Sequence, residues 1–202
     1  MGKKRKRRQI GPPGPQHFAA RAAGKVIVVG RGAAIAELLD TAIWLWFLER
    51  DPLSTHVLAV AAYQCLESLG KASGKGPIIK SKLGAETFNT AYDFLRHASS
   101  NPLTGIDFPP SHNGPIMFDA ITSFQRIFGG HITVFMLAFR AYFAIHSDLQ
   151  TSKTLLNHAD QFLPNGMTLQ EARSLSRWGA LDKLTEMFAT QHAVARPHIE
   201  SP

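Results

Sequence analysis

Cysteine is almost missing from the 202-residue sequence, which contains only Cys65. An intrachain disulfide is therefore impossible, and because Cys65 stands in an apolar stretch we expect a buried, unreactive thiol in a reducing cytoplasm. Long hydrophobic runs are missing as well: the longest, near 42–48 and 132–139, are far shorter than the ~20 residues of a membrane-spanning helix. The basic N-terminus is not followed by the apolar stretch of a secretory signal. We expect a cytoplasmic protein without a membrane span.

Sequence motifs of several enzyme classes are also missing. The nine histidines form no His-x-x-x-His or Glu-x-x-His pair within a helix, so we expect no metal site and no cofactor. Neither a Gly-x-Ser-x-Gly elbow nor a Walker loop occurs. A possible short strand at 26–29 precedes Gly30-x-Gly32, but Ile35 occupies the third glycine position of a dinucleotide fingerprint. We therefore reject nucleotide binding there.

Positive charge is concentrated at the N-terminus. The formal net charge is +7, and six of these charges come from Lys3, Lys4, Arg5, Lys6, Arg7 and Arg8, which leaves +1 for the rest. A Gly/Pro-rich spacer follows, so we interpret residues 1–24 as a disordered arm that contacts nucleic acid; a solubilising or targeting tail is the alternative. The nearly neutral remainder argues against a large nucleic-acid groove.

The rest of the chain predicts an all-α, single-domain bundle of about six or seven helices. Asp51 and Pro52 have the properties of an N-cap and a first helical residue, and Thr168 with Glu171 forms a capping-box pattern. Apolar periodicity places the helices at 33–49, 52–69, 85–98, 115–128, 131–146 and 154–162, with a final one from Thr168 to about His192. We divide the chain into the arm, a core at 25–150 and a C-terminal extension at 151–202 that packs on the core.

The predicted helix at 52–69 has apolar residues nearly all round, so we expect burial on most sides. His56, Tyr63 and Glu67 share one face of this helix. In a functional interpretation the imidazole transfers protons while Tyr63 or Glu67 orients it. In a structural interpretation the three residues form the more solvent-exposed side of the helix or a satisfied set of core hydrogen bonds.

The segment Arg50-Asp51-x-x-x-x-His56 combines an arginine, a polar residue and a histidine at the junction of two predicted helices. It resembles the ribonuclease motif of the HEPN (higher eukaryote and prokaryote nucleotide-binding) superfamily of small helical bundles. The resemblance implies metal-independent action on RNA, usually in a homodimer, with His56 as general acid/base and Arg50 as phosphate ligand. Arg126/His131 and Arg140/His146 have comparable spacings without the polar second residue.

Further polar candidates stand near the ends of two predicted helices. Arg96 and His97 stand at the end of the predicted helix at 85–98, where the helix dipole favours a positive charge. His97 could also contact solvent or a partner. Asp119 stands at the polar border of its helix, early enough to cap it, and we expect it to be solvated.

The chain also resembles, over about 35–149, a widespread group of short bacterial helical proteins with no assigned activity. The resemblance is carried by Asp51-Pro52-x-Ser54-x-His56-x-Leu58, by Phe94-Leu95-Arg96-His97-Ala98, by Asn101-Pro102 and by Asp119-Ala120. Arg96 replaces a lysine of the group's pattern, and Ser99 and Asn101 replace two acidic residues. The resemblance implies a bacterial helical protein and transfers no activity.

Two functional hypotheses follow. The first is a HEPN-like module that binds or cleaves RNA through Arg50 and His56, as a homodimer. The second is a non-catalytic interaction or structural protein with a basic tail. Under the first, replacing His56 abolishes cleavage and leaves folding nearly intact; under the second it changes only stability.

Overall fold

The computed structural model describes residues 29–71, 73–96, 105–130, 132–146, 163–164 and 166–195. All regular secondary structure in these residues is helical, which confirms the all-α prediction. The elements are α1 (Arg31–Phe47), α2 (Pro52–Gly70), α3 (Ile79–Leu83), α4 (Ala85–Arg96), the 3-10 turn η2 (Pro110–His112), α5 (Asn113–Ile127), α6 (Val134–His146), α8 (Leu169–Ser174) and α9 (Arg177–Ala195). None of these helices has the length and apolar character to cross a membrane.

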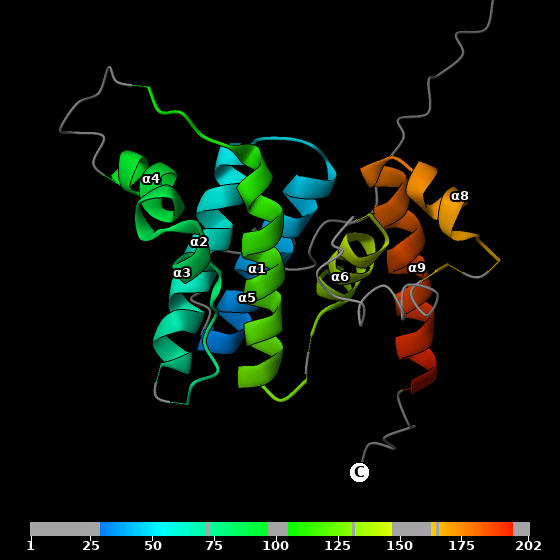
Figure 1. Cartoon of the computed structure of the whole chain (residues 1–202). Coiled ribbons are helices and arrows are strands. Elements are labelled where there is room, and N and C mark those ends of the chain that lie inside the picture. Colours follow the sequence, from blue (N-terminus) through cyan, green and yellow to red (C-terminus); the bar gives the residue numbers. More distant parts are fainter. Residues whose placement is uncertain are drawn as a thin grey trace, which may run out of the picture.

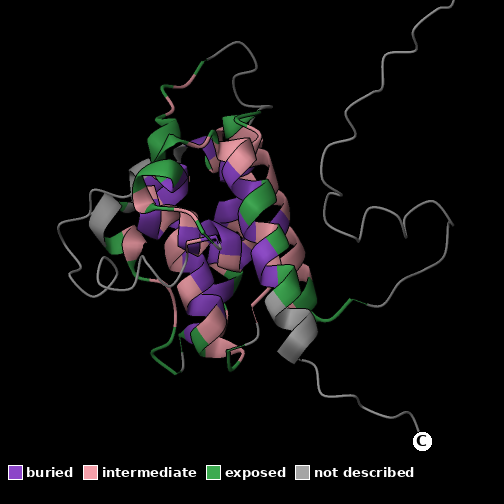
Figure 2. Cartoon of the chain, turned by 90° about the vertical axis from the view of Figure 1, so that its right-hand side faces the viewer, coloured by how far each residue is buried: buried purple, intermediate pink, exposed green. Residues whose placement is uncertain are grey.

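The helices form one bundle (Figure 1). α1, α2 and α5 pack against one another, α3 and α4 lie at one side of this group, and α6, α8 and α9 lie at the other. The buried residues lie on the parts of the helices that face one another (Figure 2). Leu181, Leu184 and Phe188 of α9 belong to the same hydrophobic core as residues of α1, α2, α5 and α6. The C-terminal helix therefore completes the core.

Most predicted helices are confirmed within about three residues, because their apolar periodicity matches their buried faces. Asp51 is the N-cap of α2, and its Oδ1 accepts a hydrogen bond from the Ser54 backbone N–H at 3.0 Å. The predicted helix at 154–162 lies outside the described residues, as does the possible strand at 26–29 apart from Val29, which is irregular.

The expectation that α2 is buried on most sides is wrong. Its buried residues cover one face, whereas Cys65 and Ser68 are exposed. α1, α4 and α5 cover only part of its circumference, and the side that carries Gln64, Cys65 and Ser68 is left outward. The expected burial of the Cys65 thiol is therefore also wrong.

The short helix α3 was not expected in the Gly/Lys-rich segment 71–84. The chain can turn back there because α2 ends at a glycine: a Cβ at Gly70 would lie 2.3 Å from the backbone nitrogen of Gly76, too close for any side chain. Five residues are too few to show apolar periodicity, and the N-terminus of α3 is stabilised by residues of other helices.

The predicted final helix is two helices. The capping box at its start is confirmed, since Thr168 Oγ1 accepts from the Glu171 backbone N–H at 3.2 Å and Glu171 Oε2 accepts from the Thr168 N–H at 2.8 Å. The chain then leaves helical geometry at Leu175, whose ψ is 141°. Ser176 Oγ accepts from the Gly179 N–H at 3.1 Å and begins α9.

Candidate functional site

His56 lies inside the bundle, in the first turns of α2. Its side chain is 1% exposed. Its Nδ1 lies 2.8 Å from the side-chain oxygen of Asn113 in α5, and its Nε2 lies 3.1 Å from the carbonyl oxygen of Phe88 in α4. The ring of Phe108 packs edge-on against the imidazole at a centroid distance of 4.9 Å. Both ring nitrogens therefore have protein partners.

Both partners of the His56 ring are hydrogen-bond acceptors. Asn113 Nδ2 donates to the Pro52 carbonyl at 2.8 Å, which turns the amide oxygen of Asn113 toward the imidazole. A neutral imidazole has a single N–H and satisfies one acceptor at a time, whereas a charged ring would satisfy both. Burial is the dominant effect and lowers the pKa of His56 below its ordinary value, although the bonds to Asn113 and Phe88 oppose this. The ring is therefore neutral at pH 7.

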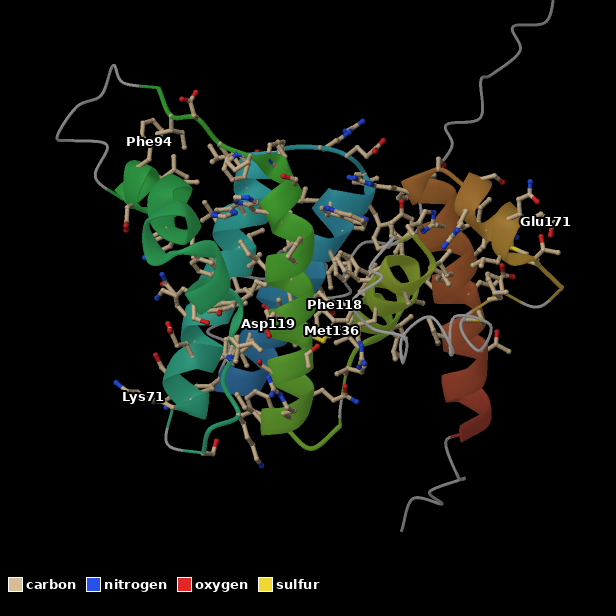
Figure 3. The ribbon with its side chains drawn as sticks, in the orientation of Figure 1. Lys71, Phe94, Phe118, Asp119, Met136 and Glu171 are labelled. Atoms are coloured by element: carbon tan, nitrogen blue, oxygen red, sulfur yellow. The ribbon has the colours of Figure 1, made fainter. Side chains whose placement is uncertain are left out.

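Tyr63 and Asp119 cap α3 from two other helices. Asp119 Oδ2 accepts from the backbone N–H groups of Ile78 and Ile79, each at 2.6 Å, and the Tyr63 hydroxyl accepts from the Lys80 N–H at 2.9 Å. Asp119 is only half-buried, but the expectation that it caps its own helix is wrong: it lies on the side of α5 toward α3 (Figure 3). Helix N-termini leave such N–H groups without internal partners.

Glu67 completes the polar stripe of α2. Its Oε2 lies 3.2 Å from Lys80 Nζ, so it forms an ion pair with the first turn of α3. Tyr63 is fully buried, and burial raises its pKa to about 12. His56, Tyr63 and Glu67 thus share one face, as the sequence predicted, and each binds α3, α4 or α5. This matches the core hydrogen-bond set of the structural interpretation, except that the neutral His56 ring donates to only one of its two acceptors.

Arg50 lies in the tight connection between α1 and α2. Its backbone N–H donates to Leu45 O at 3.2 Å and that of Glu49 donates to Trp46 O at 3.1 Å, the two bonds of a Schellman motif. Glu49, at φ 53°, occupies the left-handed position that usually carries glycine, and Asp51 follows at φ 45°. The Arg50 side chain is exposed and pairs with no other residue in the described ranges.

The structure places Arg50 and His56 in different surroundings. Arg50 lines a pocket of about 890 Å³ at the C-terminal end of α1. The pocket is also lined by Thr55, which precedes His56 in the sequence, and by Asn113, which contacts the His56 ring. His56 itself does not line the pocket. The sequence identified Arg50 through its spacing to His56 and gave no sign of the pocket, whose other walls come from η2, α5, α6 and α9.

Other predicted residues lie at or beyond the edge of the described chain. Arg96 is the last residue of α4, but its side chain, His97 and the arm residues Lys3, Lys4, Arg5, Lys6, Arg7 and Arg8 lie outside the described residues. Hydrogen bonds from the side chain and backbone of Ser54 lower the pKa of Asp51, a capping role. Among described residues no three His, Cys, Asp or Glu side chains gather closely enough to hold a metal ion.

Comparisons of this chain with protein-family models, curated proteins and solved structures gave no significant match.

Proposed function

We propose that this protein is a non-catalytic interaction module whose polar helix faces are structural, rather than a ribonuclease acting through His56. One observation carries the proposal: His56 is 1% exposed, with its two ring nitrogens at hydrogen-bond distance from Asn113 and Phe88. A general acid or base has to reach the proton that it transfers, directly or through one water. An imidazole enclosed in the bundle lacks that access.

The neighbouring polar residues support the same proposal. Tyr63 and Asp119 supply acceptors for the N-terminus of α3, and Glu67 forms an ion pair with Lys80 of that helix. Buried polar side chains in proteins are usually satisfied in this way, and their removal destabilises the fold. These contacts support a structural role for Tyr63 and Glu67.

The test is metal-independent RNA cleavage. Labelled total RNA is incubated in EDTA with the wild type, with His56→Gln, and with Arg50→Gln, and the unfolding of each sample is recorded in parallel. We expect no cleavage above the protein-free control from any of the three. Cleavage by the wild type that His56→Gln loses while retaining the wild-type fold would contradict the proposal and favour the HEPN-like hypothesis.

The proposal assigns nucleic acid as a partner of the basic arm. Six positive charges in Lys3–Arg8 are enough for up to about six phosphate contacts. Deleting residues 2–9 should weaken binding to nucleic acid and flatten the dependence of affinity on salt. Deleting the spacer residues 11–15 keeps every charge and is the matched control. Equal affinity and equal salt dependence after both deletions would show that the arm does not bind.

We propose a cytoplasmic homodimer separately: the single cysteine suits a reducing compartment, and the dimer is what the resemblance to HEPN bundles implies. Light scattering during size-exclusion chromatography measures the mass directly against the 22.2 kDa chain. A monomer at all concentrations would remove the dimer from the proposal and leave the interaction module unaffected.

A further inference from the structure

The pocket at the end of α1 has a wall of aromatic side chains. Trp46, Tyr142 and Phe143 line it, and the rings of Trp46 and Tyr142 meet edge-on at a centroid distance of 5.3 Å. The His146 ring stacks on Tyr142 at 3.8 Å with an interplanar angle of 14°. The volume of about 890 Å³ is in the range of small-molecule sites. Planar apolar groups pack favourably on such a wall.

The charged groups of the pocket have an excess of positive charge. Its ionised residues are Glu49, Arg50 and Arg177. Arg177 lies 3.5 Å from Glu49 through its Nε, and its guanidinium carbon lies 4.1 Å from the centroid of the Trp46 ring. Glu49 therefore offsets Arg177, whereas Arg50 has no counter-charge within the described part of the chain.

The His146 imidazole adds no charge at neutral pH. Its Nδ1 lies 3.0 Å from the Tyr142 carbonyl, which can only accept, so the neutral ring carries its proton on Nδ1. Burial lowers the pKa of His146 below its ordinary value. The excess charge of the pocket is therefore that of Arg50 alone.

A tight turn places the backbone of Arg50 at the edge of this pocket. The residues on both sides of it, Glu49 and Asp51, have positive φ, and two Schellman hydrogen bonds close the turn. Non-glycine residues in this conformation cost about 1 kcal/mol or more each, and such strain often occurs at ligand sites. An arginine on a fixed turn, beside an aromatic wall and without a counter-charge, is well placed for a planar anion.

We propose that this pocket binds a small organic anion, in which a carboxylate or phosphate pairs with Arg50 and an attached planar ring packs on Trp46, Tyr142 and Phe143. A carboxylate and a phosphate share the geometry that the guanidinium fork recognises. An apolar molecule would leave Arg50 uncompensated, and a cation would be repelled by it. This site is independent of whether the protein cleaves RNA.

The test is calorimetric titration of the full chain with four probes: benzoate, phenyl phosphate, inorganic phosphate and benzyl alcohol. We expect the two aromatic anions to bind, and inorganic phosphate and benzyl alcohol each to bind at least about fivefold more weakly, because each lacks one of the two recognised groups. Comparison of benzoate with phenyl phosphate decides which anion the pocket prefers.

Three variants locate the binding. Arg50→Gln should weaken the binding of the two aromatic anions by about tenfold, because it removes one charge-assisted pair. Arg31→Gln removes the same charge from an exposed position at the opposite end of α1 and should change affinity by less than about twofold. Ser111→Trp places a bulky side chain on the exposed rim of the pocket and should abolish binding without altering its charges.

Several results would overturn the proposal. The first is that neither aromatic anion binds at about 10 mM, and the second is that Arg50→Gln binds them as tightly as the wild type does. The third is that inorganic phosphate binds as tightly as phenyl phosphate, which would indicate a non-selective ion site. None of these results affects the RNA-cleavage assay, so this proposal and the proposed function fail separately.

Discussion

The side-chain oxygen of Asn113 lies 2.8 Å from Nδ1 of His56 and joins the start of α5 to the start of α2. The same amide donates to the Pro52 carbonyl at 2.8 Å, so one buried side chain fixes both the imidazole and the first residue of α2. The contacts of Asn113 thus tie His56 to the Asp51-Pro52 start of α2.

Asn113→Ala should therefore destabilise the fold. It leaves the Pro52 carbonyl without its donor and removes one of the two acceptors at the buried His56 ring, and we expect the free energy of unfolding to fall by about 1–3 kcal/mol. Urea unfolding measures the change. Ser111→Ala, two residues earlier and exposed, is the control and should stay within about 0.5 kcal/mol of wild type. Equal stability of both variants would show that the Asn113 contacts contribute nothing.

Stability should fall as the solution becomes acidic. Burial lowers the pKa values of His56 and His146 in the folded state, so below about pH 6.5 the unfolded chain binds protons that the folded chain does not. The free energy of unfolding is then highest above the unfolded-state pKa and declines through the window between the unfolded and folded values. Urea midpoints measured from about pH 7.5 to 5.5 follow this decline.

His56→Gln provides the control for the acid effect because glutamine does not titrate. Its stability is lower at neutral pH but should decline less steeply toward acid than that of the wild type. Parallel declines in the two proteins would assign the effect to other groups, His146 among them.

Two substitutions should each expose different backbone amides at the start of α3. Asp119→Ala removes the acceptor of the Ile78 and Ile79 amides, and Tyr63→Phe removes that of the Lys80 amide. We expect each variant to lose about 1 kcal/mol or more of stability, and amide hydrogen exchange should accelerate at Ile78 and Ile79 in the first and at Lys80 in the second. Acceleration at the same amides in both variants would contradict separate capping roles.

Glu49→Gly should stabilise the protein. Glycine adopts the left-handed φ of 53° without strain. The substitution also removes the ion pair between Arg177 and the exposed Glu49 carboxylate, but the loss of such a surface pair costs little stability. We expect the melting temperature to rise, by an amount that corresponds to about 0.5–1 kcal/mol. Glu49→Ala removes the same ion pair but keeps the strain, and it should not be stabilised. A rise in both variants would indicate that the carboxylate itself is unfavourable.

Local signals in the sequence predicted much of the fold. The Asp51-Pro52 start of α2 and the capping box at Thr168 depend on atoms within a few residues, so they are readable from sequence alone. α3 was missed because its caps come from Tyr63 and Asp119, which are 17 and about 40 residues away along the chain. The division of the last helix was missed although Ser176 is a good N-cap, since continuous helical periodicity concealed it.

The candidate site was predictable only in part. His56, Tyr63 and Glu67 do share a face, because helical spacing fixes that relationship. Whether such a face is solvent-exposed or buried depends on which helices pack against it, and the periodicity of one helix does not show that. The pocket at Arg50 draws its walls from Trp46, Pro110, Tyr142 and Arg177, residues that only the tertiary fold brings together.

The most direct test of the account is the free energy of unfolding of His56→Ala and Arg50→Ala, measured side by side in urea at pH 7. The account predicts that His56→Ala loses about 2–4 kcal/mol, since it leaves a buried acceptor without its donor and opens a cavity, whereas Arg50→Ala loses less than about 0.5 kcal/mol because its side chain is exposed. A His56→Ala protein as stable as the wild type would contradict the structural role of His56 and return it to consideration as a catalytic residue.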